Sequence, residues 1–153
     1  MTRISASEAL SLYDRSLHEL GERAHQIKLR RHGNRVTYIK TYYCNFTNIC
    51  KYACKYCGFR RNKTDPDAYT LSIDAIQKKL CTAPESLTEV WFSNGLNGEL
   101  PYNYYLELLR ETKKNLPKVQ IKAFTAVEID FFARHYEKSH AQVLDDFMEA
   151  GLD

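Results

Sequence analysis

The chain has 153 residues, of which 44% are apolar and 12% aromatic, and its formal net charge is +3 at pH 7. This length supports one globular core, and so mild a charge argues neither for nor against an anionic partner. With no apolar run near the roughly 18 residues of a membrane span, no signal-peptide pattern, and an odd number of cysteines, we expect a cytoplasmic protein without a membrane span.

Residues 1–35 are predicted to form an N-terminal helical segment. Ser5 begins a capping-box pattern, and apolar residues follow it at helical spacing. Gly21 is expected to interrupt the helix, and Gly33 to end it. Basic residues gather at 28–31 and again at 60–63. We interpret both groups as solvated surface and expect no nucleic-acid partner.

Residues 36–153 alternate between predicted strands and helices. Runs of β-branched and aromatic residues predict three strands, with Trp91 in the core of the second. The strands are expected at 36–43, 87–92 and 119–124, and the helices from Ser72, Pro101, Glu128 and Ser139 onwards.

This alternation is typical of an α/β fold with a parallel sheet and right-handed crossovers. Three βα units are too few to close a (β/α) barrel, which takes about 250 residues. We therefore expect residues 36–153 to be the N-terminal part of a TIM-type barrel. The chain looks truncated, because it stops at Asp153 where a fourth strand should begin.

Three cysteines, Cys50, Cys54 and Cys57, follow the first predicted strand with the spacing C-x3-C-x2-C. Such a run can place its thiolates around one small inorganic group. Structural zinc needs four ligands, and no second pair of cysteines or histidines completes the set. A [4Fe–4S] cluster on three cysteines keeps one iron open for chemistry. We favour the cluster; zinc and disulfide pairing are the alternatives, and Cys44 could add a fourth ligand.

The motif Cys50-x3-Cys54-x-Tyr56-Cys57 resembles the signature of the radical S-adenosylmethionine (SAM) enzymes. The resemblance implies that the three cysteines bind three irons of a [4Fe–4S] cluster, that SAM chelates the fourth iron, and that Tyr56 lies against the adenine. Residues 46–59 resemble the radical SAM enzymes of the futalosine route to menaquinone and of deazaflavin synthesis. Residues 121–129, Ile-Lys-Ala-Phe-Thr-Ala-Val-Glu-Ile, resemble the aminofutalosine synthase branch.

This resemblance implies a transferase of menaquinone biosynthesis. The 5′-deoxyadenosyl radical from SAM would add to 3-[(1-carboxyvinyl)oxy]benzoate, and loss of the carboxylate would give aminofutalosine. A reduced flavodoxin- or ferredoxin-type protein would supply the electron. The alternatives are the sister enzyme, cyclic dehypoxanthinyl futalosine synthase, and an inactive cluster- or zinc-binding fragment.

Two further residues are candidates for SAM binding, and no catalytic residue is assigned. Gly95 lies where the superfamily places a glycine-rich strand end near the SAM amino group, although residues 93–98 depart from the common run Gly-Gly-Leu-His-Pro. Glu128 faces the SAM ribose or amine, or it is a helix N-terminal carboxylate. Thr47 and Asn48 line the substrate or brace the cysteine loop, and a local turn would explain them nearly as well.

Overall fold

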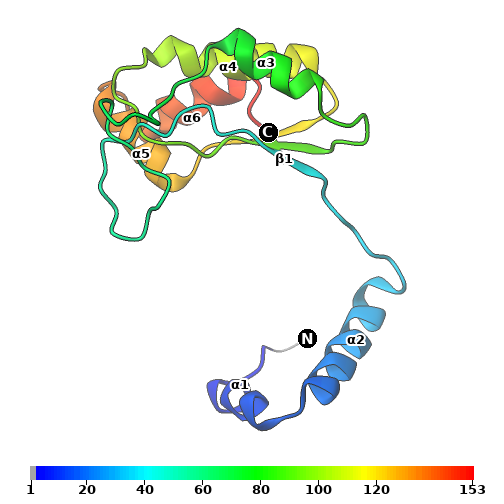
Figure 1. The fold of residues 1–153 in the computed structure, drawn as a ribbon. Coiled ribbons are helices and arrows are strands. Elements are labelled where there is room, and N and C mark those ends of the chain that lie inside the picture. The colour runs from blue at the N-terminus through cyan, green and yellow to red at the C-terminus, as the bar shows by residue number, and fades with distance from the viewer. Residues whose placement is uncertain (1–2) are drawn as a thin grey trace. The chain divides into compact units, whose positions relative to one another are not determined.

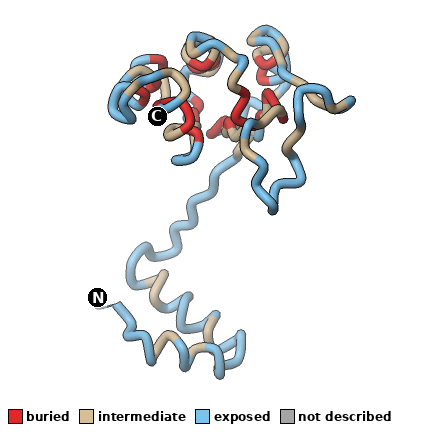
Figure 2. The backbone as a smooth tube through the Cα atoms, turned by 90° about the vertical axis from the view of Figure 1, so that its left-hand side faces the viewer, coloured by how far each residue is buried: buried red, intermediate tan, exposed pale blue. Residues whose placement is uncertain are grey.

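The computed structural model describes residues 3–153. The chain divides into two compact units, one ending at Tyr38 and the other running from Ile39 to Asp153 (Figure 1). None of residues 3–38 is buried, whereas the second unit contains the apolar core (Figure 2). No helix in this described stretch combines the length and the apolar composition needed to cross a bilayer.

The first unit is helical, and its internal break differs from the prediction. Ser5 caps the first helix by accepting a hydrogen bond from the backbone of Glu8. The break predicted at Gly21 is wrong: it falls at Ser16, whose reciprocal capping box with Glu19 starts a new helix. Gly33 ends that helix with φ 58°, as predicted. The elements are α1 (Ala6–Ser11), η1 (Leu12–Asp14) and α2 (Leu17–His32).

The second unit is built on a parallel sheet in the order β1-β2-β3. Its strands are β1 (Thr41–Tyr43), β2 (Glu89–Trp91) and β3 (Gln120–Lys122). The predicted strands are confirmed as elements, but they are shorter than expected. Residues 36–39 belong to no strand and are exposed. Their β-branched and aromatic composition favours extended backbone, yet a strand also needs a neighbour to pair with.

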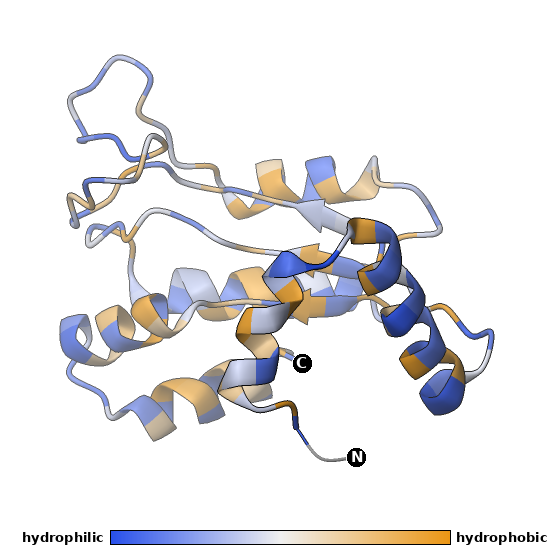
Figure 3. Ribbon diagram, turned by 90° about the horizontal axis from the view of Figure 1, so that it is seen from below, coloured by the Kyte–Doolittle hydropathy of each residue, from blue (hydrophilic) through white to orange (hydrophobic). Residues whose placement is uncertain are grey.

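Helices cover one face of this sheet (Figure 1). They are α3 (Ile73–Cys81), α4 (Tyr102–Asn115), α5 (Ala126–His135) and α6 (His140–Glu149). Their apolar residues form stripes (Figure 3), and the buried ones share one core with Val90 of β2 and Ile121 of β3. The predicted α/β fold with parallel strands is therefore confirmed.

Three details of the helices differ from the prediction. α5 begins at Ala126, before Glu128, because Thr125 supplies the cap. Pro101 is the N-cap of α4 and precedes its first helical residue. On α6, the apolar spacing of the sequence predicts four inward residues, of which Val143 and Phe147 are buried but Leu144 and Met148 are exposed. The last helix therefore buries a narrower stripe than its sequence indicates.

Trp91 is not in the core, contrary to the sequence-based expectation. Successive strand residues point to opposite faces of a sheet. Val90 takes the helix-covered side and is fully buried, so Trp91 lies on the opposite face and is half-buried. Its ring centroid is 4.7 Å from that of Tyr43 on β1.

Candidate functional site

The three clustered cysteines lie in a loop that leaves the carboxyl end of β1 and protrudes from the sheet (Figure 1). Cys50 is half-buried, whereas Cys54, Tyr56 and Cys57 are exposed. The backbone N–H of Cys57 donates to the carbonyl of Cys54 at 3.0 Å, which closes a tight turn. Among residues 3–153, no group of three histidine, cysteine or acidic side chains stands close enough to hold a metal ion. The loop therefore does not draw its thiols together in this structure.

The stem of the loop is fixed by two fully or nearly fully buried polar side chains. The hydroxyl of Thr47 donates to the carbonyl of Tyr69 at 2.9 Å and lies 2.8 Å from the hydroxyl of Thr70. The amide of Asn48 donates to the carbonyl of Asp67 at 2.9 Å and accepts from the backbone N–H of Tyr69 at 2.8 Å. Both residues thus brace the loop against residues 67–70, as one of the sequence-based hypotheses expected.

Gly95 lies in the loop after β2, residues 93–98, here called the glycine loop. Its backbone contacts the stem of the cysteine loop. A Cβ at this position would lie 2.3 Å from the carbonyl oxygen of Ile49, so no other residue fits without moving the chain. The N–H of Gly95 donates to the carbonyl of Thr47 at 2.9 Å, and the N–H of Lys51 donates to that of Leu96 at 2.9 Å. The glycine loop and the cysteine loop are therefore joined along their backbones.

Glu128 links the chain after β3 to the glycine loop. Its carboxylate accepts hydrogen bonds from the backbone N–H of Thr125 at 2.7 Å and of Asn94 at 3.2 Å. The first completes a capping box on α5, so the helix-terminal role is real. Burial raises the pKa of Glu128 above its ordinary value, and the hydrogen bonds from Thr125 and Asn94 oppose this shift without cancelling it.

Asn94 is a junction that the sequence analysis missed. Its side-chain oxygen accepts from the backbone N–H groups of Phe46 and Thr47, which orients the amide nitrogen the other way. That nitrogen is buried and has no hydrogen-bond partner among residues 3–153. The available signal was the departure from the family's glycine pair immediately before Gly95. Asn94 connects the cysteine loop, the glycine loop and Glu128.

Comparison with known proteins identifies the family. No family model matches the chain. The chain is 38% identical over 153 residues to aminodeoxyfutalosine synthase of Streptomyces coelicolor, covering 99% of this chain and 40% of that protein. The chain belongs to the radical SAM superfamily. The expected resemblance to the aminofutalosine synthase branch is confirmed.

Other radical SAM enzymes are almost as similar. The chain is 34% identical over 131 residues to a 5-amino-6-(D-ribitylamino)uracil–L-tyrosine 4-hydroxyphenyl transferase of Methanopyrus kandleri, covering 85% of this chain and 36% of that one. The crystal structure of methylornithine synthase matches the fold with a TM-score of 0.65 at 16% identity, over 99% of this chain and 54% of that one. This chain thus spans about two fifths of the length of these two curated relatives.

A cavity of about 380 Å³ opens beside Cys50 of the radical SAM motif. It lies among the cysteine loop, the glycine loop and the last residue of α5, His135, whose ring bonds the carbonyl of Gly98 at 2.8 Å. Cys44, by contrast, is buried in the core, and desolvation raises the pKa of its thiol to about 11. Cys44 therefore lies apart from the loop cysteines, in the core of the second unit.

The raised pKa of Glu128 predicts a pH-dependent stability difference. A carboxyl whose folded pKa is raised binds protons more tightly when folded, so its contribution to stability falls as the pH rises between the unfolded and the folded pKa. Glu128→Gln lacks this dependence. The unfolding free energy of wild type minus that of the variant is therefore expected to fall across this interval in denaturant titrations. A difference that rises with pH would show that the hydrogen bonds outweigh burial.

Proposed function

We propose that this chain is part of a cytoplasmic radical SAM transferase of the aminofutalosine synthase type. The reaction would add the 5′-deoxyadenosyl group of SAM to 3-[(1-carboxyvinyl)oxy]benzoate with loss of the carboxylate, for menaquinone biosynthesis. The observation that carries the proposal is the 38% identity to an aminodeoxyfutalosine synthase along nearly the whole chain. A reduced flavodoxin- or ferredoxin-type protein is the proposed electron donor.

The residues present fit a [4Fe–4S] cluster and SAM. Cys50, Cys54 and Cys57 would hold the cluster, which supplies the electron for SAM cleavage when it is bound. All three are free cysteines, the two at the tip are exposed, and the hydrogen bonds of Thr47 and Asn48 hold the stem. This combination suits a loop that closes around a ligand and keeps its register with the sheet.

The groups around the stem complement the methionine end of SAM. An ammonium needs acceptors and a carboxylate needs donors. Glu128 supplies an acceptor, and the amide nitrogen of Asn94, which has no partner among residues 3–153, supplies a donor in the same region. Gly95 lets the two backbones approach. We propose Gly95 and Glu128 as SAM-binding residues, with Tyr56, whose ring is fully exposed, as the neighbour of the adenine.

Anaerobic reconstitution with iron and sulfide tests this function. We expect about four irons per chain and a reduced cluster whose electron paramagnetic resonance spectrum changes when SAM is added. Adding 3-[(1-carboxyvinyl)oxy]benzoate should then yield aminofutalosine. Zinc without iron, or a cluster indifferent to SAM, would indicate an inactive cluster- or zinc-binding fragment. Turnover of the substrate of cyclic dehypoxanthinyl futalosine synthase instead would assign the chain to that sister enzyme.

A further inference from the structure

The face of the sheet opposite the helices carries an ordered row of side chains. Tyr43, Trp91 and Lys122 are register partners on the three neighbouring strands. The ammonium of Lys122 lies 3.8 Å from the centroid of the Trp91 ring, and the Tyr43 ring packs against that ring from the next strand. Two aromatic rings and one cation therefore stand side by side on a face that none of the helices of residues 39–153 covers.

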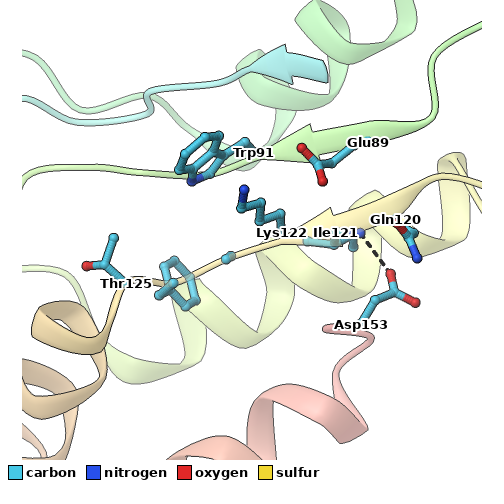
Figure 4. Close-up of a pocket in the computed structure, with 9 residues that line it drawn as sticks. Glu89, Trp91, Gln120, Ile121, Lys122, Thr125 and Asp153 are labelled. Atoms are coloured by element: carbon cyan, nitrogen blue, oxygen red, sulfur yellow. Dashed lines mark hydrogen bonds between the residues drawn. The ribbon is translucent and has the colours of Figure 1, made fainter. Parts of the chain in front are cut away.

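A cavity of about 320 Å³ is lined by two members of this row, Trp91 and Lys122, while Tyr43 packs against Trp91 outside it. Figure 4 shows Lys122 between Trp91 and Glu89, with Thr125 at one end of the cavity and Asp153 at the other. Trp91 and Lys122 are the last residues of their strands, and the chain beyond them leads to the loop that holds Gly95 and to the first turn of α5, which holds Glu128. Thr125 lines this cavity and donates its backbone N–H to Glu128, so the cavity adjoins one residue of the proposed SAM site.

The charges in this cavity are unequally satisfied. Glu89 is buried, with 7% of the residue exposed, and its carboxylate accepts a hydrogen bond from the hydroxyl of Thr41 at 2.8 Å. Within residues 3–153, the ammonium of Lys122 forms no ion pair and lies against the Trp91 ring. An ammonium keeps three donors for hydrogen bonding when it lies against a ring face. The cavity thus presents a cation that can pair with an anion next to a flat apolar surface.

We propose that Tyr43, Trp91 and Lys122 bind a small aromatic carboxylate. The carboxylate pairs with the ammonium of Lys122, and the aromatic ring packs against Trp91 and Tyr43 in the offset or edge-on arrangements that aromatic pairs prefer. This inference rests on the function proposed above, because it assigns the acceptor of that reaction to this cavity. The recognition itself requires neither SAM nor a cluster.

Trp91 is the single tryptophan of the chain, so its fluorescence reports on this cavity alone. Titration with isophthalate, an aromatic dicarboxylate, is expected to change the fluorescence to saturation. Benzamide, which is aromatic but neutral, and cyclohexanecarboxylate, which is charged but not aromatic, should bind at least tenfold more weakly. Equal binding of benzamide would overturn the role of the cation, and no saturable change with isophthalate would overturn the site.

Substitution of Lys122 completes the test. Lys122 is exposed, so Lys122→Met should leave the fold intact. This variant is expected to bind isophthalate at least tenfold more weakly than wild type. Lys122→Arg, which keeps the positive charge, should retain most of the affinity. Lys118→Met, at an exposed lysine outside the cavity, is the matched control and should bind as wild type does. Unchanged affinity in Lys122→Met would overturn the proposal. The proposed function is tested separately, by SAM cleavage in the wild-type protein with no aromatic carboxylate present. The proposed function and the proposed binding site can therefore fail independently.

Discussion

Replacing Cys54 with Ala is expected to reduce SAM cleavage to background in the reconstituted protein. If Cys50, Cys54 and Cys57 are the protein ligands, removal of one thiolate leaves an iron without its ligand. Cys54 is exposed and lies outside every helix and strand, so the substitution should not disturb the core. We expect less iron per chain, no spectral response to SAM, and an unchanged unfolding midpoint.

Cys81→Ala provides the matched control for this variant. Cys81 is also an exposed free cysteine, but it ends α3 and lies outside the motif. Its replacement should leave iron content and SAM cleavage at wild-type levels. Cleavage retained by Cys54→Ala would disprove the ligand assignment, and equal losses in both variants would point to a general sensitivity to thiol removal.

Gly95→Ala is expected to destabilise the protein and to abolish the response to SAM. The added Cβ would lie 2.3 Å from the carbonyl oxygen and 2.8 Å from the carbonyl carbon of Ile49. Both atoms belong to the backbone, so the clash can be relieved only by separating the glycine loop from the cysteine loop. Overpacking of this kind costs about 1–3 kcal/mol. Denaturant unfolding measures the stability, and the spectrum of the reduced cluster measures the SAM response.

Gly58→Ala separates this steric effect from a general effect of adding a methyl group. Gly58 lies in the exposed part of the cysteine loop, and a Cβ there would have no neighbour within 4 Å. Its unfolding free energy should stay within about 0.5 kcal/mol of wild type. Wild-type stability of Gly95→Ala would mean that the two loops are not held together as closely as the structure shows.

Local chemistry made much of the fold predictable. Ser72 and Ser139 cap the helices that their sequences predict, because a hydroxyl before an apolar-periodic run satisfies free N–H groups within one turn. The extent of β1 was not predictable in this way, since pairing depends on residues such as Glu89 that lie far along the chain. The prediction that Trp91 lies in the core failed for a related reason, because composition does not say which face of a sheet the helices will cover.

The same distinction between local patterns and long-range contacts applies to the candidate site. The cysteine spacing is a local pattern and could be read directly, although its role as a ligand set stays a prediction. The junction at Asn94 could not, because its side chain reaches Phe46 across 48 positions in the chain. The row that joins Lys122 to Trp91 likewise exists only once the register of β2 and β3 is known. Contacts between loops from different strands build this region, and a single sequence does not reveal them.

The contrast between Cys44 and the exposed cysteine pair has a consequence for handling the protein in air. Oxidants attack thiolates at accessible positions. Cys54 and Cys57 are exposed within one tight turn, whereas Cys44 is buried and its thiol is a very weak acid. Oxidative damage should therefore begin at the protruding loop and spare the folded core. A preparation that has lost its capacity to take up iron in this way would keep its native circular dichroism spectrum. A reductant would restore iron uptake if oxidation has stopped at a disulfide.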